Sequence, residues 1–181
     1  GAYGNHQVHT PTLDRLANSG VRFDNAYTPS PICIPARASF ATGLYTFQHR
    51  CWSSAEPYYG QQQSWMHRLR DKGHEVTSIG KLHYRSASDD LGFSEQILPM
   101  ANEGKGWPQA LMRKPMGTFP ETAELAAEIG PGETSYTRYD RDISAAAVNW
   151  LSRPHGDKPW VLFVSFICPH FPLKAPQQFY D

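Results

Sequence analysis

A nearly unbroken apolar run at residues 159–167, Pro-Trp-Val-Leu-Phe-Val-Ser-Phe-Ile, constrains the fold more than any other segment. Continuous rather than alternating apolarity predicts a strand buried on both faces, because a strand with one face in water alternates polar and apolar side chains. Such strands occur in parallel sheets that helices cover on both sides. A helix with one apolar face is indicated just before the run, at residues 140–151. We therefore expect an α/β fold with a mostly parallel central sheet sandwiched by helices.

The rest of the chain fits this arrangement. Capping residues and apolar spacing predict helices at residues 10–20 and 62–72. Strands are predicted directly after them, at residues 21–27 and 75–79. Residues 86–131 are rich in Gly, Pro and Met and have no clean period, so we expect loops and short helices there.

Composition excludes several classes of function. The 181 residues contain 17 Lys plus Arg and 17 Asp plus Glu, so there is no basic footprint for nucleic acid and no polybasic tail for a membrane surface. No apolar run approaches the roughly 20 residues that span a bilayer. The three cysteines are an odd number without Cys-x-x-Cys spacing, which argues against a disulfide framework and a cysteine zinc site.

A short helix is predicted to begin at Cys33. Pro35 suits its first turn, where a missing N–H costs nothing, and Gly43 suits its end because glycine tolerates positive φ. Cys33 would then lie where unpaired amide groups stabilise negative charge, and Arg37 would add a fixed cation one turn on. This arrangement favours a thiolate, or any oxyanion built on the side chain of residue 33.

Three further polar residues follow directly on predicted strands. Lys81 and His83 come after the strand at residues 75–79, and His170 comes after the apolar strand. Ligands of an open parallel sheet bind in the crevice at the carboxyl ends of its strands. Taken singly, such residues are typical of a solvated surface. Together with Cys33 and Arg37 they predict one shared site.

These residues also carry a family resemblance. The chain resembles the type I, formylglycine-dependent sulfatases of the alkaline-phosphatase-like superfamily, in which the signature cysteine is oxidised to formylglycine. The matching positions are Cys33, Pro35, Arg37, Thr42 and Gly43 of the signature, then Gly80-Lys81-x-His83, then Pro169-His170-x-Pro172. Residues 89–93, Asp-Asp-Leu-Gly-Phe, look nearer to choline-sulfatase-like and phosphonate-hydrolase-like members than to lysosomal arylsulfatases.

The resemblance implies hydrolysis of a small-molecule sulfate ester. Hydrated formylglycine at Cys33 would attack sulfur, and Arg37 would hold the diol and stabilise its charge. Lys81 and His170 would bind the sulfate oxygens, and His170 would protonate the departing alcohol. His83 would then take a proton from the second hydroxyl, which expels sulfate and restores the aldehyde.

The resemblance also implies Ca²⁺ or another divalent cation, with Cys33 as formylglycine supplying only part of its six to eight oxygen ligands. The other ligands would lie before and after this chain. We therefore expect residues 1–181 to be a partial catalytic domain that lacks the first strand and the C-terminal portion, and to be inactive alone. A formylglycine-generating enzyme is an expected partner. A homo-oligomer is left open, and the cytoplasm or periplasm of a bacterium is the expected compartment.

Three alternatives remain at this point. A formylglycine-dependent phosphonate monoester or phosphodiester hydrolase would use the same nucleophile. A cysteine phosphatase would use unmodified Cys33, but that chemistry has five residues between Cys and Arg, where this chain has three. A non-catalytic domain of the same fold is the third, and the retained Cys33, Arg37, Lys81 and His83 argue against it.

Three aromatic residues after the signature helix give a further hypothesis. Trp52, Tyr58 and Tyr59 could form a rim at the mouth of the site. Such a rim would suit a quaternary ammonium group by cation–π contact.

Overall fold

A three-stranded parallel sheet organises the chain in the computed structural model, which describes residues 1–102, 123–124 and 127–180. The strand order is β2-β1-β4, with bounds Glu95–Met100, Glu75–Lys81 and Trp160–Ser165. Both neighbours of β1 run parallel to it. The predicted α/β class with a parallel sheet is confirmed.

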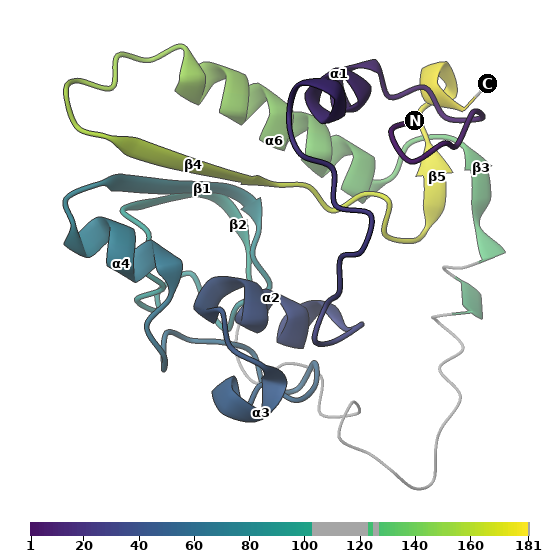
Figure 1. Ribbon diagram of the computed structural model, residues 1–181. Coiled ribbons are helices and arrows are strands. Elements are labelled where there is room, and N and C mark those ends of the chain that lie inside the picture. Colours follow the sequence, from purple (N-terminus) through teal and green to yellow (C-terminus); the bar gives the residue numbers. More distant parts are fainter. Residues whose placement is uncertain (103–122, 125–126, 181) are drawn as a thin grey trace, which may run out of the picture.

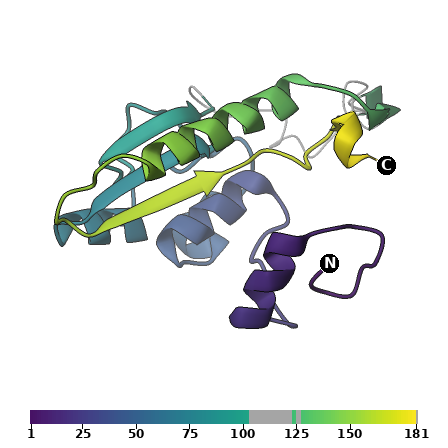
Figure 2. The same cartoon turned by 90° about the horizontal axis from the view of Figure 1, so that it is seen from above.

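Helices cover both faces of this sheet (Figure 1). On one face lie α2 (Cys33–Thr42) and α4 (Trp65–Asp71), with the short α3 (Thr46–His49) beyond α2. On the other face lies the long helix α6 (Ser135–Leu151). Helix α1 (Pro11–Ser19) has no buried residue and lies beside the sheet rather than on it, as Figure 2 shows.

Side chains of alternate residues in the strands enter two separate apolar cores. Val76 of β1 packs with α2 and α4, while Ile79 of the same strand packs against α6. Strand β4 does the same, with Phe163 toward the first core and Val164 toward the second. Both faces of β4 are therefore covered, as its apolar run predicts. Its side chains are only partly buried because β4 pairs with β1 alone among the described residues.

The helix predictions are largely confirmed. Helix α2 begins at Cys33, and Gly43 ends it in the left-handed region at φ 70°. Helix α4 is shorter than predicted, and α6 begins five residues earlier than the predicted residue 140, where Thr134 accepts a hydrogen bond from the Thr137 amide as its N-cap.

Two predictions about strands are wrong. Residues 21–27 form no strand, because no strand of the described part lies beside them and their apolar side chains are exposed, Tyr27 by 91%. Strand β2 and a three-residue strand at Ile129–Pro131 lie in the region predicted to be loops and short helices. Pro99 of β2 argues against a strand in sequence, but β2 is at the edge of the sheet, where proline is tolerated.

A second small sheet lies at the C-terminal end, formed by β3 (Ile129–Pro131) and β5 (Leu173–Ala175), with a 3-10 helix η2 (Gln177–Phe179) after it. No helix within the described residues has the length and apolarity needed to span a membrane.

Candidate active site

The carboxyl ends of β1 and β4 meet the start of α2, as the sequence predicts. Lys81 is the last residue of β1, and Ser165 is the last residue of the neighbouring β4. Arg37 of α2 joins them: its Nη1 donates to the Lys81 carbonyl oxygen at 2.8 Å and to Ser165 Oγ at 3.2 Å. One guanidinium therefore fixes three elements that are far apart in sequence.

Arg37 and Lys81 place two cations in a largely dehydrated position. Only 4% of Lys81 is exposed. Burial lowers the pKa of Lys81, and the charge of Arg37 lowers it further, while Cys33 and Asp140 act in the opposite direction. Burial also lowers the pKa of Arg37. One buried and one half-buried cation side by side favour an anion between or beside them.

Cys33 occupies the first turn of α2 and is partly exposed. The N-cap residue, Ile32, makes no side-chain hydrogen bond to the helix, so no side chain caps the first-turn amides. The other two cysteines differ. Burial raises the pKa of Cys51 to about 11 and has the same effect on Cys168. Cys33 is thus the cysteine whose surroundings suit reaction with an anionic substrate.

His83 lies among the same charges in an unusual backbone conformation, at φ 57°. Burial lowers its pKa to about 4, and Lys81, Arg37 and His170 contribute in that order. Its Nδ1 is buried and has no hydrogen-bond partner among the described residues. His83 is therefore neutral near pH 7 and retains a nitrogen that can accept a proton.

His170 completes the predicted set from the loop after β4. Its ring is exposed, and Nδ1 lies 2.8 Å from the Phe171 carbonyl oxygen. Because a carbonyl oxygen only accepts, Nδ1 carries the hydrogen of this bond, and Nε2 is the nitrogen left for another partner. The structure thus brings together all five predicted residues, since His83 interacts electrostatically with His170, Lys81 and Arg37, and Lys81 interacts with Cys33.

Two polar residues of this region escaped the sequence analysis. Ser165 accepts from Arg37, and Asp140 accepts backbone hydrogen bonds from Ile167 and Cys168. A signal existed for Asp140. It lies three residues before Ile143 on the buried face of α6, and a carboxylate on an apolar face needs buried partners. Ser165 is a small polar residue in an otherwise apolar strand. Close packing would explain a small side chain there as well as a role in the site does, so its position alone gives no signal.

The geometry agrees with the comparison to known families. The family described as Sulfatase matches residues 1–181. The chain belongs to the sulfatase family. The alternative of an unmodified cysteine phosphatase therefore loses its support.

Sulfatase relatives of several kinds match this chain. It is 33% identical to choline-sulfatase of Rhizobium meliloti over 96% of its length, and 36% identical to N-acetylglucosamine-6-O-sulfatase of Bacteroides thetaiotaomicron over 93%. It spans only 36% and 27% of the length of these two relatives.

A solved structure of phosphonate monoester hydrolase from Agrobacterium radiobacter matches with a TM-score of 0.68 and 26% identity. The match covers 97% of this chain and 39% of the hydrolase chain. Both kinds of relative that the sequence analysis singled out are thus found.

A sulfatase-type metal is not accounted for by the described residues. No group of three or more His, Cys, Asp or Glu side chains within them could hold a metal ion. Three aspartates of the described residues are engaged in ion pairs: Asp24, Asp89 and Asp90 pair with Arg22, Arg85 and Arg70, respectively. The residues present therefore do not by themselves fit Ca²⁺, and ligands supplied from outside them stay a prediction.

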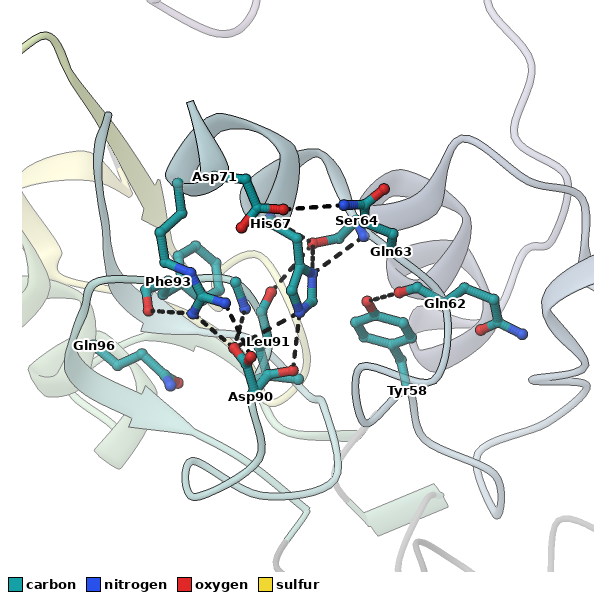
Figure 3. Close-up of polar contacts among 12 residues, drawn as sticks. Tyr58, Gln62, Gln63, Ser64, His67, Asp71, Asp90, Leu91, Phe93 and Gln96 are labelled. Carbon is teal, nitrogen blue, oxygen red and sulfur yellow. Dashed lines mark hydrogen bonds and ion pairs between the residues drawn. The ribbon is translucent and has the colours of Figure 1, made fainter. Parts of the chain in front are cut away.

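A second polar cluster of the sulfatase chain has the residue types of a serine-histidine-aspartate triad (Figure 3). Ser64 Oγ lies 2.7 Å from His67 Nδ1. His67 Nε2 lies 3.2 Å from the Asp90 carbonyl oxygen and 3.7 Å from Asp90 Oδ1, whereas Arg70 approaches that Oδ1 to 2.7 Å. Ser64 is fully buried and accepts the His67 amide as the N-cap of α4. The cluster therefore attaches the loop at residues 89–93 to α4 and is not a catalytic triad.

The hypothesis of an aromatic rim is wrong for Tyr58 and stays a prediction for Tyr59 and Trp52. Tyr58 is fully buried, and its hydroxyl donates to the Gln62 carbonyl oxygen at 2.5 Å. The guanidinium of Arg85 lies 4.2 Å from the ring centroid of Tyr59, so a cation of the chain itself takes that face. Trp52 remains exposed.

Proposed function

We propose that the protein hydrolyses sulfate esters with formylglycine derived from Cys33. The observation that carries this proposal is the anion site at the start of α2, where the half-buried Arg37 and the buried Lys81 lie near a cysteine on an uncapped helix start. A sulfate monoester carries its negative charge on the oxygens that such a site would bind.

Each residue has a distinct proposed task. Lys81 and His170 bind the sulfate oxygens, and Arg37 holds the oxygen atoms at residue 33. When present, hydrated formylglycine supplies a hydroxyl nucleophile together with a second hydroxyl that allows sulfate to leave. Rigid attachment of Arg37 to both strand ends keeps its charge in place without reorganisation during the reaction.

Proton transfer falls to the two histidines. Because the Nδ1 hydrogen of His170 is bound to its own loop, the ring acts as an imidazolium with a second hydrogen on Nε2, which binds a sulfate oxygen and then protonates the departing alcohol. Neutral His83 accepts the proton from the second hydroxyl. The negative charge of a bound sulfate opposes the effect of Lys81 and Arg37 on the pKa of His83, which makes this histidine a stronger base in the complex than in the free protein.

A second candidate function is hydrolysis of phosphonate monoesters by the same nucleophile, favoured by the structural match to phosphonate monoester hydrolase. Nothing in the five residues distinguishes sulfur from phosphorus. Turnover of 4-nitrophenyl sulfate and of a phosphonate monoester with the same leaving group by the intact protein separates the two. A larger kcat/KM for the phosphonate ester would overturn the main proposal.

Formylglycine itself is tested by the mass of the tryptic peptide at residues 23–37. Conversion of cysteine replaces SH and H by a carbonyl oxygen, so the peptide should weigh about 18 Da less than its cysteine form. Expression without a formylglycine-generating enzyme, the proposed partner, is the control and should leave the cysteine mass. An unmodified peptide from an active protein would contradict the proposal.

We also propose that a divalent cation, Ca²⁺ by family resemblance, assists this site with ligands from outside the described residues. Dialysis of the intact protein against a chelator should abolish turnover, and added Ca²⁺ should restore it. Full activity after dialysis, with no metal detected by elemental analysis, would exclude this cofactor.

A further inference from the structure

The carboxylate of Asp140 holds the chain at the point where it leaves the sheet. Oδ1 accepts the Ile167 amide at 2.8 Å, and Oδ2 accepts the Cys168 amide at 2.9 Å. Strand β4 ends at Ser165, so its ladder offers these amides no partner, and Ile167 is buried. Buried amides need a partner, and a carboxylate satisfies both.

The held segment leads directly to His170. The His170 amide donates to the Ile167 carbonyl oxygen at 3.1 Å, which closes a turn on the residue that Asp140 binds. One helical turn before Asp140, the Tyr136 ring meets the His170 ring edge-on, with centroids 5.8 Å apart. Helix α6 therefore contacts both the backbone that carries His170 and the imidazole itself.

The same face of α6 also lies against the other strand end. Ile143, three residues after Asp140, packs so closely on Gly80 that a β-carbon there would stand 2.7 Å from Ile143 Cδ1. Gly80 immediately precedes Lys81. Tyr136, Asp140 and Ile143 thus form one stripe that sets the position of His170 relative to Lys81.

We propose that Asp140 is a positioning residue for His170. Asp140 holds this histidine at the distance from Lys81 that a sulfate ester requires. The proposal rests on the function proposed above. Asp140 touches no reacting atom in this scheme, since both of its oxygens are engaged by backbone amides. Its negative charge near Lys81 also offsets part of the positive charge of the site.

The test uses Asp140→Asn in the intact protein, with Asp142→Asn as matched control. The asparagine amide would keep one acceptor and turn an NH₂ group toward the second backbone amide. Asp142 is on the same helix and exposed. If His170 protonates the leaving alcohol, its displacement should harm substrates with poor leaving groups most. We expect kcat to fall about 10-fold or more further for an alkyl sulfate than for 4-nitrophenyl sulfate, and no such difference for Asp142→Asn.

A double-mutant cycle with His170→Ala separates positioning from general damage. If Asp140 acts through His170, Asp140→Asn should add less than about threefold in the His170→Ala background. Equal loss on both esters, or full additivity with His170→Ala, would overturn the proposal and leave Asp140 a purely structural anchor.

Amide hydrogen exchange at residues 166–170 is a readout that needs no turnover. Exchange should accelerate in Asp140→Asn and not in Asp142→Asn. If the wild-type protein turns over no sulfate ester while exchange still accelerates in Asp140→Asn, the proposed function is refuted and the anchoring of the loop stands. Unchanged exchange would refute the anchoring itself, whatever the activity.

Discussion

Replacing Gly80 by alanine should damage both stability and the site, because this residue lies where three elements come close together. Gly80 pairs with Ser165 across β1 and β4 and has a φ of +100°. A β-carbon there would stand 2.3 Å from the Ser165 carbonyl oxygen, whereas ordinary contact starts at 3.4 Å. One of the two backbones would have to move by about 1 Å.

Gly73 provides the matched control. It also has a positive φ, +87°, but nothing lies within 4 Å of its added β-carbon. The left-handed conformation costs a non-glycine residue about 1–2 kcal/mol at either position. Overpacking between β1 and β4 adds about 1–3 kcal/mol at Gly80 alone. Gly80→Ala should therefore lower the free energy of unfolding by about 2–5 kcal/mol, and Gly73→Ala by about 1–2 kcal/mol.

Urea denaturation of the intact protein and its two variants measures the difference. The kcat for a sulfate ester, measured where all three proteins are folded, tests the consequence for the site. A displacement of about 1 Å next to Lys81 should lower kcat by about 100-fold in Gly80→Ala and leave Gly73→Ala near wild type. Equal losses of stability within about 0.5 kcal/mol would show that the close approach to Ser165 does not constrain the strands.

Three further predictions concern His83, Ser64 and the contacts of Arg37. Folding lowers the pKa of His83 to about 4, so the unfolded chain binds its proton first as pH falls. The free energy of unfolding of the wild type should therefore drop between about pH 7 and 4, by on the order of 2 kcal/mol more than that of His83→Asn. Urea titrations at several pH values measure this difference, and a smaller or opposite difference would refute the prediction. Ser64→Ala removes the buried N-cap of α4 and should lower the free energy of unfolding, measured with urea, by about 1–2 kcal/mol. The control Ser144→Ala, at an exposed position, should lower it by less than about 0.5 kcal/mol. Equal effects of the two substitutions would contradict the capping role. In Arg37→Lys a single ammonium would have to serve both strand ends and the substrate anion, whereas Arg37 uses Nη1 alone for the two strand ends. This variant should lower kcat far more than Ser165→Ala, which removes a single bond. The reverse order would argue against Arg37 as the link between elements.

The parts of the fold that local chemistry determines were predictable from the sequence. Pro35 and Gly43 bound α2 correctly, and the apolar run gave β4 with both faces covered. The convergence of Lys81, His83 and His170 followed from a general property of parallel sheets, so it needed no knowledge of side-chain contacts.

The failures arose where partners distant in sequence decide the outcome. Residues 21–27 alternate as a strand does, yet a strand forms only beside another, and nothing in the local pattern reveals that neighbour. Strand β2 contains a proline that an edge position tolerates, and edge position is a property of the whole sheet. Tyr58 was assigned to a rim because its loop follows the signature helix, whereas its ring packs edge-on against Tyr84 in the core.

The electrostatics of the site explain why its residues come from separate elements. Two cations brought together without water raise the energy of the folded chain, as the lowered pKa values of Arg37 and Lys81 indicate. Asp140 opposes only the effect on Lys81, and both of its oxygens accept backbone amides. A carboxylate paired directly with Lys81 would cancel this positive potential. The fold leaves part of the charge uncompensated, which costs stability and, under the proposed function, is available to bind an anionic substrate.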